Sequence, residues 1–186
     1  EMPAEPPAPR SAAPAPSSAP VASSGPTQIR LTAEATDERR RFLGLSDDDL
    51  QRLRELRPLI AAHTPAILED FYALLASRSE TATLVPPDTA RRLKQQVASY
   101  WMELVDGGFD RPYAASRMRI GVIHEKVGVG TASYLTGLAR QLCGLARAIV
   151  RERPAPLDDL RALVRAVFFD LSFVIDAYME ARVDTL

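Results

Sequence analysis

The sequence predicts an all-α protein. Only nine of the 186 residues are glycine, and β-branched residues rarely cluster. From about Ala33 onward, apolar residues recur three and four positions apart, which is the periodicity of one helix face. Prolines and short acidic clusters fall between these periodic segments, where helices usually begin or end. No credible pair of strands is present in the pattern.

The N-terminal part of the chain differs in composition from the rest. Residues 1–30 are mostly Pro, Ala and Ser, which bury little apolar surface, and we expect a disordered tail there. The folded domain is therefore expected over residues 31–186. It should begin with a short lead helix over about Ala33–Leu43. Ser46 and the aspartates after it then favour a helix start by capping and by the helix dipole.

The remaining helix boundaries follow from the same signals. The helix after Ser46 carries Leu50, Leu53, Leu56, Leu59 and Ile60 on one face, and Thr64-Pro65 is typical of the start of the next helix. A loop is expected over 79–86. The later helices are predicted over about Asp88–Asp106, from Asp110 to Gly128, over about Thr131–Glu152, and from Leu157 to the C-terminus.

The last two predicted helices each have two apolar faces. In the sixth, large residues form one stripe and small residues the other: Tyr134, Leu138, Leu142, Leu145, Ile149 against Ala139, Cys143, Ala146, Val150. The last helix is apolar nearly all round between Leu163 and Met179. A helix with two apolar faces needs two partners, so we expect a homodimer through a four-helix bundle, the alternative being one monomeric core.

Composition excludes several classes of protein. The formal net charge is −1, from 23 basic and 24 acidic side chains, so the basic excess of a nucleic-acid-binding domain is missing. No apolar run reaches the roughly 18 residues of a membrane span, and no signal peptide is recognisable. The single cysteine, Cys143, fits a reducing compartment. These features together predict a cytoplasmic protein.

Only two histidines are candidates for chemistry. His63 precedes Thr64-Pro65 at a predicted helix end, a typical solvated position. His124 lies among apolar residues with Gly121 one turn before it, where a missing side chain lets a flat group approach the helix. Periodicity alone favours a core histidine at this position. No second His or Cys stands at zinc spacing, and no catalytic triad, phosphate loop or dinucleotide motif is present.

Several segments in the expected order resemble the globin-coupled sensor family, which is related to the protoglobins. The resemblance covers roughly Glu38 to Ala181. It rests on the following segments: Arg41-Phe42-Leu43-Gly44-Leu45-Ser46, Phe71-Tyr72, Leu93 to Gly108 with Trp101 and Leu104, Ile120-Gly121 with His124 and Val127-Gly128-Val129, Tyr134, and Phe169-Asp170 to Tyr178. It implies a globin fold of the sensor type, with an extra N-terminal helix and without a D helix.

The resemblance also implies the ligands of a haem group. His124 would be the proximal ligand of the iron of haem b, with the opposite position open to a gas. Tyr72 would donate a hydrogen bond to bound O₂ on the distal side. Leu93 would occupy the position where myoglobin-type globins place a histidine, with Val97 one turn further along the same wall. Gln96 is a candidate for a second hydrogen-bonding group.

Other residues would surround the porphyrin by the same resemblance. Phe71, Val127 and Tyr134 would pack on the ring, although ordinary core packing explains Phe71 equally well. Three basic residues could pair with the haem propionates, and a solvated face is the other interpretation of each: Arg117, Arg119 and Lys126.

The function implied is that of a haem-based O₂ sensor domain without enzymatic activity. Such a domain binds O₂, or CO or NO, and signals through its last two helices to a partner or output module. Family members usually carry that module C-terminally, whereas this sequence stops at Leu186. The expectation is therefore either an excised sensor domain or a natural single-domain sensor globin. Two alternatives stay open: a protoglobin-like haem enzyme with peroxidase or dioxygenase chemistry, and a haem-free helical regulatory dimer in which His124 belongs to the core.

Overall fold

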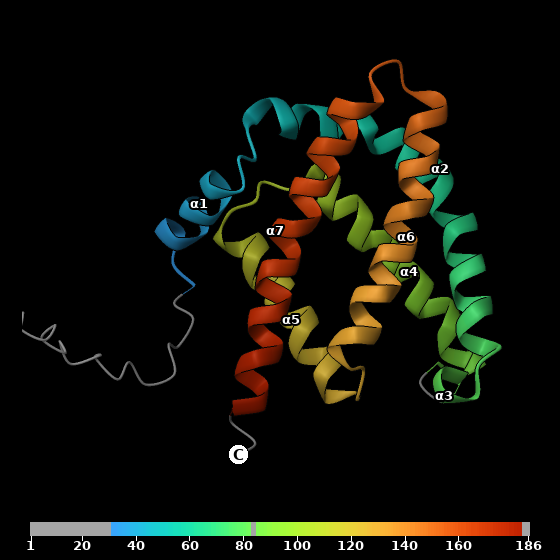
Figure 1. Ribbon diagram of the computed structural model, residues 1–186. Coiled ribbons are helices and arrows are strands. Elements are labelled where there is room, and N and C mark those ends of the chain that lie inside the picture. Colours follow the sequence, from blue (N-terminus) through green and yellow to red (C-terminus); the bar gives the residue numbers. More distant parts are fainter. Residues whose placement is uncertain (1–30, 83–84, 184–186) are drawn as a thin grey trace, which may run out of the picture.

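The structure, a computed structural model, describes residues 31–82 and 85–183 (Figure 1). These residues form helices joined by short loops, and they contain no strand, as predicted. The expected tail and the last three residues lie outside the described part. The helices are α1 (Ala33–Phe42), α2 (Asp47–Ala76), α3 (Ser79–Ala82), α4 (Pro87–Asp106), α5 (Arg111–Lys126), α6 (Thr131–Glu152) and α7 (Pro156–Val183).

The helix starts are capped as the sequence indicates. The Ser46 hydroxyl accepts from the backbone N–H of Asp49, and the Asp49 carboxylate accepts from the backbone N–H of Ser46 at 2.9 Å. This reciprocal pair is a capping box, which satisfies two backbone donors at once. Asp110 caps α5 through the Tyr113 N–H at 2.9 Å. These caps fix where α2 and α5 begin.

One predicted boundary is wrong. Thr64-Pro65 does not start a helix, because α2 continues unbroken from Asp47 to Ala76 with Pro58 and Pro65 inside it. The Thr64 hydroxyl donates to the Ile60 carbonyl at 2.6 Å, so the side chain bonds backward along an existing helix rather than capping a new one. The predicted loop after α2 also contains one helical turn, α3.

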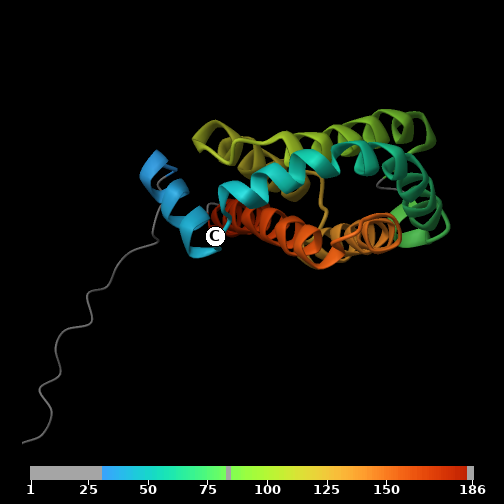
Figure 2. The same ribbon diagram turned by 90° about the horizontal axis from the view of Figure 1, so that it is seen from above.

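The helices form two layers. Among the described residues α2 packs on α4, α5 packs on α7, and α6 packs on both α2 and α7. Viewed from above, α2 and α4 lie along one side and α6 and α7 along the other (Figure 2). The fully buried core joins the layers: Leu53, Leu56, Ile60, Trp101, Leu104, Leu145, Ile149, Leu163, Phe169. Consecutive helices α4 and α5 are not an extensively packed pair.

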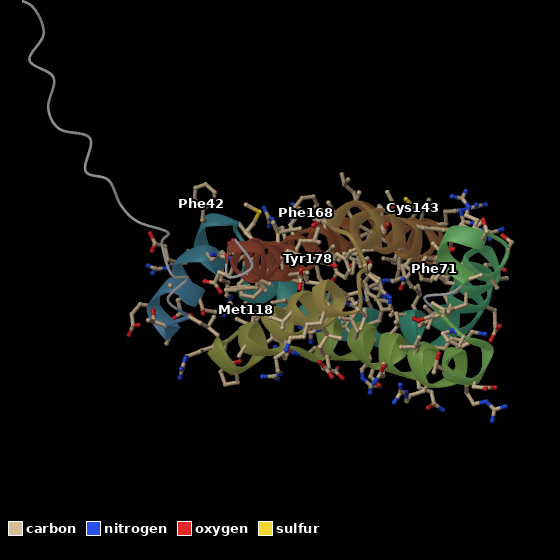
Figure 3. All side chains as sticks on the ribbon, turned by 90° about the horizontal axis from the view of Figure 1, so that it is seen from below. Phe42, Phe71, Met118, Cys143, Phe168 and Tyr178 are labelled. Carbon is tan, nitrogen blue, oxygen red and sulfur yellow. The ribbon has the colours of Figure 1, made fainter. Side chains whose placement is uncertain are left out.

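The last two helices each bury one face and expose the other, as predicted. Leu138, Leu145 and Ile149 of α6 are buried, whereas the small-residue stripe leaves Ala139, Cys143 and Val150 exposed. Along α7 the exposed apolar side chains are Leu157, Val164, Phe168 and Met179. Figure 3 shows Phe168 and Cys143 along the same outer edge of the molecule. One apolar face of this helix pair therefore has no partner within the described chain.

By length and composition alone, one helix of the described residues, α2, could cross a membrane. Such a match is weak, because core helices of folded domains also satisfy it. Here α2 packs against α4, α6 and α7, and its Leu53, Leu56 and Ile60 side chains are fully buried in the common core.

Candidate functional site

His124 lies near the C-terminal end of α5 and is mostly shielded from solvent. Its Nδ1 lies 2.8 Å from the carbonyl oxygen of Ile120, one turn earlier. A carbonyl can only accept, so Nδ1 carries the proton and Nε2 keeps its lone pair. Nε2 makes no hydrogen bond to any described residue. Burial lowers the pKa of His124, opposed by the hydrogen bond to Ile120, so the ring is neutral at pH 7.

Aromatic rings hold the imidazole in place. The Tyr134 ring, at the start of α6, meets the His124 ring edge-on with centroids 4.9 Å apart. The Tyr178 ring of α7 lies 6.0 Å from that of Tyr134, and its hydroxyl donates to the Val129 carbonyl at 2.8 Å. Tyr178 thereby ties the loop after α5 to α7 (Figure 3). The sequence suggested Tyr134 but gave Tyr178 no such role.

Gly121 brings α5 close to α7. A Cβ at this position would lie 2.5 Å from the Val174 carbonyl oxygen and 2.9 Å from Cβ of Ala177. The predicted close approach at Gly121 is therefore real, but the group that approaches is the backbone of α7. His124 is one turn further along the same helix, so this contact fixes where its ring projects.

Tyr72 lies on α2, on the other layer, and is 8% exposed. Its hydroxyl makes no hydrogen bond to any described residue, and burial raises the pKa of Tyr72 to about 12. The phenol is therefore protonated at neutral pH and has a proton to donate. The Phe71 ring contacts it edge-on at 5.4 Å.

A hollow of about 300 Å³ opens beside Tyr72. Its wall is mainly small apolar side chains, namely Ala73, Ala76, Val85 and Ala90. An ion pair between Lys94 Nζ and Glu69 Oε2, 2.5 Å apart, stands at its edge. The Lys94 ammonium lies 5.8 Å from the Tyr72 ring centroid. A small molecule could reach Tyr72 through this hollow, a feature that the sequence did not reveal.

The other predicted site residues differ in their exposure to solvent. Leu93 and Val97 are half-buried on α4, and Val97 packs on the core. Gln96, on the same helix, is exposed, and Val127 at the C-terminal cap of α5 is 58% exposed. Their contacts to a porphyrin remain predictions.

The structure corrects the interpretation of one basic residue. Arg119 and Lys126 are exposed, as a solvated face requires. Arg117 is instead fully buried and faces Glu103 and Asp170. His63 is partly exposed, as expected, and its Nε2 lies 2.6 Å from Glu152.

Donor chemistry decides which cofactor the site can hold. No group of three or more His, Cys, Asp or Glu side chains lies together among residues 31–82 and 85–183, so a bare metal ion has no ligand cluster there. One imidazole with a free Nε2 and a fixed Nδ1–H is what a haem iron requires from one side. The residues at His124 therefore fit haem, whose other iron ligands belong to the porphyrin.

A family model described as Protoglobin matches residues 32–183, nearly all of the described chain. The chain belongs to the protoglobin family. A relative of this protoglobin-family chain is the "Heme-based aerotactic transducer HemAT" of Halobacterium salinarum, which is 32% identical over 159 residues. That match covers 78% of this chain but 32% of the relative, so the chain spans about a third of its length.

Two solved structures share the fold. The globin domain of the Geobacter sulfurreducens globin-coupled sensor matches with a TM-score of 0.71 at 21% identity, covering 76% of this chain and 96% of that one. The globin domain of E. coli DosC, in a ferric form, matches with a TM-score of 0.62 at 11% identity, covering 79% and 99%. The predicted globin fold of the sensor type is thus confirmed, including the lead helix α1.

Proposed function

We propose that this domain is a haem-based gas sensor, with haem b held by Nε2 of His124. The observation that carries the proposal is the hydrogen bonding of the His124 imidazole. Its Nδ1–H donates to the Ile120 carbonyl, and its Nε2 has no partner among the described residues. A satisfied core histidine would use both nitrogens. The relative named a haem-based aerotactic transducer supports the same assignment.

When bound at His124, haem would supply an iron that can bind O₂, CO or NO reversibly. The chain's own residues set the conditions on each side. The Ile120 carbonyl holds the imidazole in the tautomer with Nε2 unprotonated, and Tyr134 restricts its rotation. Tyr72 keeps its proton at neutral pH and can donate it to a polar gas ligand. Leu93 and Val97, half-buried on α4, would line the same space and offer no competing ligand.

The cheapest test is the visible spectrum of the protein purified with haem. We expect a Soret band that is displaced or lost in His124→Ala. His63→Ala is the matched control, because it removes the only other histidine, which pairs with Glu152 at the surface. An unchanged spectrum in His124→Ala refutes ligation. Full helicity without any haem uptake favours the haem-free alternative.

The distal donor has its own test. Tyr72→Phe removes the hydroxyl and keeps the ring, so we expect the O₂ dissociation constant to rise about tenfold, the equivalent of one hydrogen bond. The CO dissociation constant should change little, since CO accepts hydrogen bonds weakly. Equal changes for both gases contradict the role of Tyr72. Rapid oxidation of the iron, with turnover of a reductant and substrate, would favour the enzyme alternative.

The signalling surface proposed is the exposed face of α6 and α7, which we assign to a second copy of the chain. Phe168 is 54% exposed there and Val150 58%. A hollow of about 360 Å³ lies beside Val150 and Ala146, and could receive a side chain from the second copy. The free, exposed Cys143 on this face is consistent with a cytoplasmic dimer.

Sedimentation velocity tests the dimer. Phe168→Glu places a charge on the face and should shift the protein to monomer. Ser99→Glu, at an exposed position of α4 in the opposite layer, should leave the dimer intact. A wild-type monomer at all concentrations overturns the assignment, and so does a Phe168→Glu dimer of unchanged affinity.

A further inference from the structure

A charged pair is completely buried between α5 and α7. The side chains of Arg117 and Asp170 are each 1% exposed, and Arg117 Nε lies 3.7 Å from Asp170 Oδ2. The guanidinium lies 4.3 Å from the ring centroid of Tyr113 and 4.9 Å from that of Tyr100. Its other ionic partner is Glu103 on α4, 2.6 Å from Nη2. The arginine is therefore desolvated and held by aromatic faces as well as by charge.

The carboxyl group of Asp170 is the less satisfied partner. Neither of its oxygens has a hydrogen bond of good geometry within the described residues, nor have the buried hydroxyls of Tyr100 and Tyr113. Buried polar groups of this kind are rare in native proteins and call for an explanation. Both phenols are nevertheless near enough to act on Asp170 as hydrogen-bond donors, which favours its ionised form. A proton on Asp170 would remove its charge and supply a donor in its place.

Burial raises the pKa of Asp170 to about 7, against the lowering effects of Arg117 and the two phenols. The groups facing it come from every neighbouring element: Tyr100 and Glu103 on α4, Tyr113 and Arg117 on α5, and Tyr134 on α6. Near neutral pH the cluster can therefore exist in two charge states. Nothing in the proposed haem chemistry uses this proton.

The cluster around Arg117 and Asp170 lies at one end of the contact between α5 and α7 that positions His124. Arg117, Gly121 and His124 follow each other at spacings of four and three, so they share a face of α5. On α7, Asp170 is one turn before Val174, whose carbonyl lies against Gly121. The pair and the glycine are successive contacts along one helix–helix seam. His124 is one turn beyond them.

A second connection runs through α6. Burial, and after it the negative charge of Asp170, raises the pKa of Tyr134, the residue whose ring touches that of His124. Asp170 itself is not in contact with His124. A change of its charge would thus reach the imidazole through the α5–α7 seam and through the Tyr134 ring.

We propose that Arg117 and Asp170 are proton-linked positioning residues, which set how α5 lies on α7 and so where His124 holds the haem iron. The ionised pair draws the helices together at this end of the seam. Protonation of Asp170 releases that attraction and weakens the donation from the two phenols, which favour the ionised carboxylate. Because linkage is reciprocal, gas binding that moves His124 shifts the proton equilibrium of Asp170 by the same free energy. This inference rests on the proposed haem ligation.

The test compares Asp170→Asn with wild type in the haem-loaded protein between pH 5.5 and 8.5. Two quantities are measured: the O₂ dissociation constant and the iron–histidine stretching frequency of the ferrous protein. We expect the wild-type dissociation constant to change about fivefold across pH 7, the lower end of common coupling energies, with a parallel shift in frequency. Asp170→Asn should be flat in both.

Asp176→Asn is the matched control. Asp176 is also on α7 and pairs with Arg39 at 2.7 Å, but it is 30% exposed and outside the seam. This variant should keep the wild-type pH profile. A flat wild-type profile overturns the proposal, and so does a profile that survives in Asp170→Asn.

Two further measurements need no variant. Infrared difference spectra of the wild-type protein, with and without CO, should contain a carbonyl band of a protonated carboxylic acid that changes on ligand binding and titrates near pH 7. The absence of such a band overturns the proposal. In the haem-free protein, carboxyl carbon resonances should include one Asp that titrates near pH 7. If this Asp titrates but the reconstituted protein has no Soret band, the haem function alone is refuted. If the Soret band is present but no Asp titrates near pH 7, the proposed role of Arg117 and Asp170 is refuted.

Discussion

Replacing Gly121 with alanine tests whether the seam between α5 and α7 is as tight as its geometry indicates. The new methyl group would lie 2.5 Å from the Val174 carbonyl oxygen, where an ordinary carbon–oxygen contact needs about 3.3 Å. The obstacle is backbone, which cannot rotate away, so α5 must move by roughly 0.8 Å. Overpacking of this kind costs about 1–3 kcal/mol.

The higher helix propensity of alanine partly offsets this overpacking cost. Alanine is a better helix former than glycine by about 1 kcal/mol, and Gly121 is inside α5. The net expectation for Gly121→Ala is a loss of up to about 2 kcal/mol in the free energy of unfolding. His124 is on the same helix one turn later, so the Soret band should also shift. Urea denaturation followed by circular dichroism measures the first effect, and absorbance of the haem-loaded protein the second.

Gly137→Ala provides the control for helix propensity. Gly137 is also inside a helix, but its added methyl would meet only the Phe71 ring, at 3.1 Å, and a side chain can shift by a few tenths of an ångström. We expect its stability to stay within about 1 kcal/mol of wild type. A Gly121→Ala protein as stable as Gly137→Ala, with an unshifted Soret band, would refute the argument that this seam positions His124.

Three further predictions concern stability. Trp101→Phe removes the donor of the buried hydrogen bond from Nε1 to Gln141 Oε1, 2.9 Å long, and should lower the free energy of unfolding by about 1–3 kcal/mol in urea; a smaller loss would mean that Gln141 finds another donor. Ser46→Ala destroys the capping box with Asp49 and should cost about 1 kcal/mol by the same assay. The third is a pH dependence. The folded protein retains a proton on Asp170 that the unfolded chain releases near pH 4, so this residue makes stability fall as pH rises from about 4 to about 7. Thermal melts of Asp170→Asn should lack that contribution, and slopes equal to wild type would contradict the raised pKa.

Local signals in the sequence predicted most of the fold. Six of its helices begin within a residue or two of the expected positions, because signals such as Ser46, Asp110 and the prolines before α7 act on the backbone beside them. The helix start predicted at Thr64-Pro65 was wrong because the same dipeptide also occurs in the interior of helices. Leu53, Leu56 and Ile60 before it and Leu68 after it are all buried. Their common burial favours one continuous helix despite the donor that Pro65 lacks, and that balance depends on tertiary packing.

The candidate site was predictable in part for the same reason. Gly121 and His124 are one helical turn apart, so their proximity could be inferred from spacing, whereas Tyr134 was suggested by the family resemblance. Arg117 was interpreted as a haem-propionate partner or a solvated charge, because sequence periodicity does not show what faces a helix. The missed signal was Asp170, an acidic residue in the otherwise uncharged stretch Ala166–Ile175 of α7. A charged side chain within such an apolar stretch needs a partner of opposite charge. Arg117, two helical turns before His124 on α5, could have been identified as that partner.

The position of Arg117 and Asp170 at the contact between α5 and α7 indicates a role for the pair. Replacing Arg117 and Asp170 with apolar residues of similar volume would often be neutral or stabilising, so their burial is weak evidence for a role in stability. A buried pair that apolar residues could often replace without loss of stability, and that stands on the face that carries His124, is better explained by control of geometry. The same helix, α7, presents Phe168 on the outer face proposed for the second copy. A shift of α5 on α7 would therefore act on the haem ligand at one side of this helix and on the dimer face at the other.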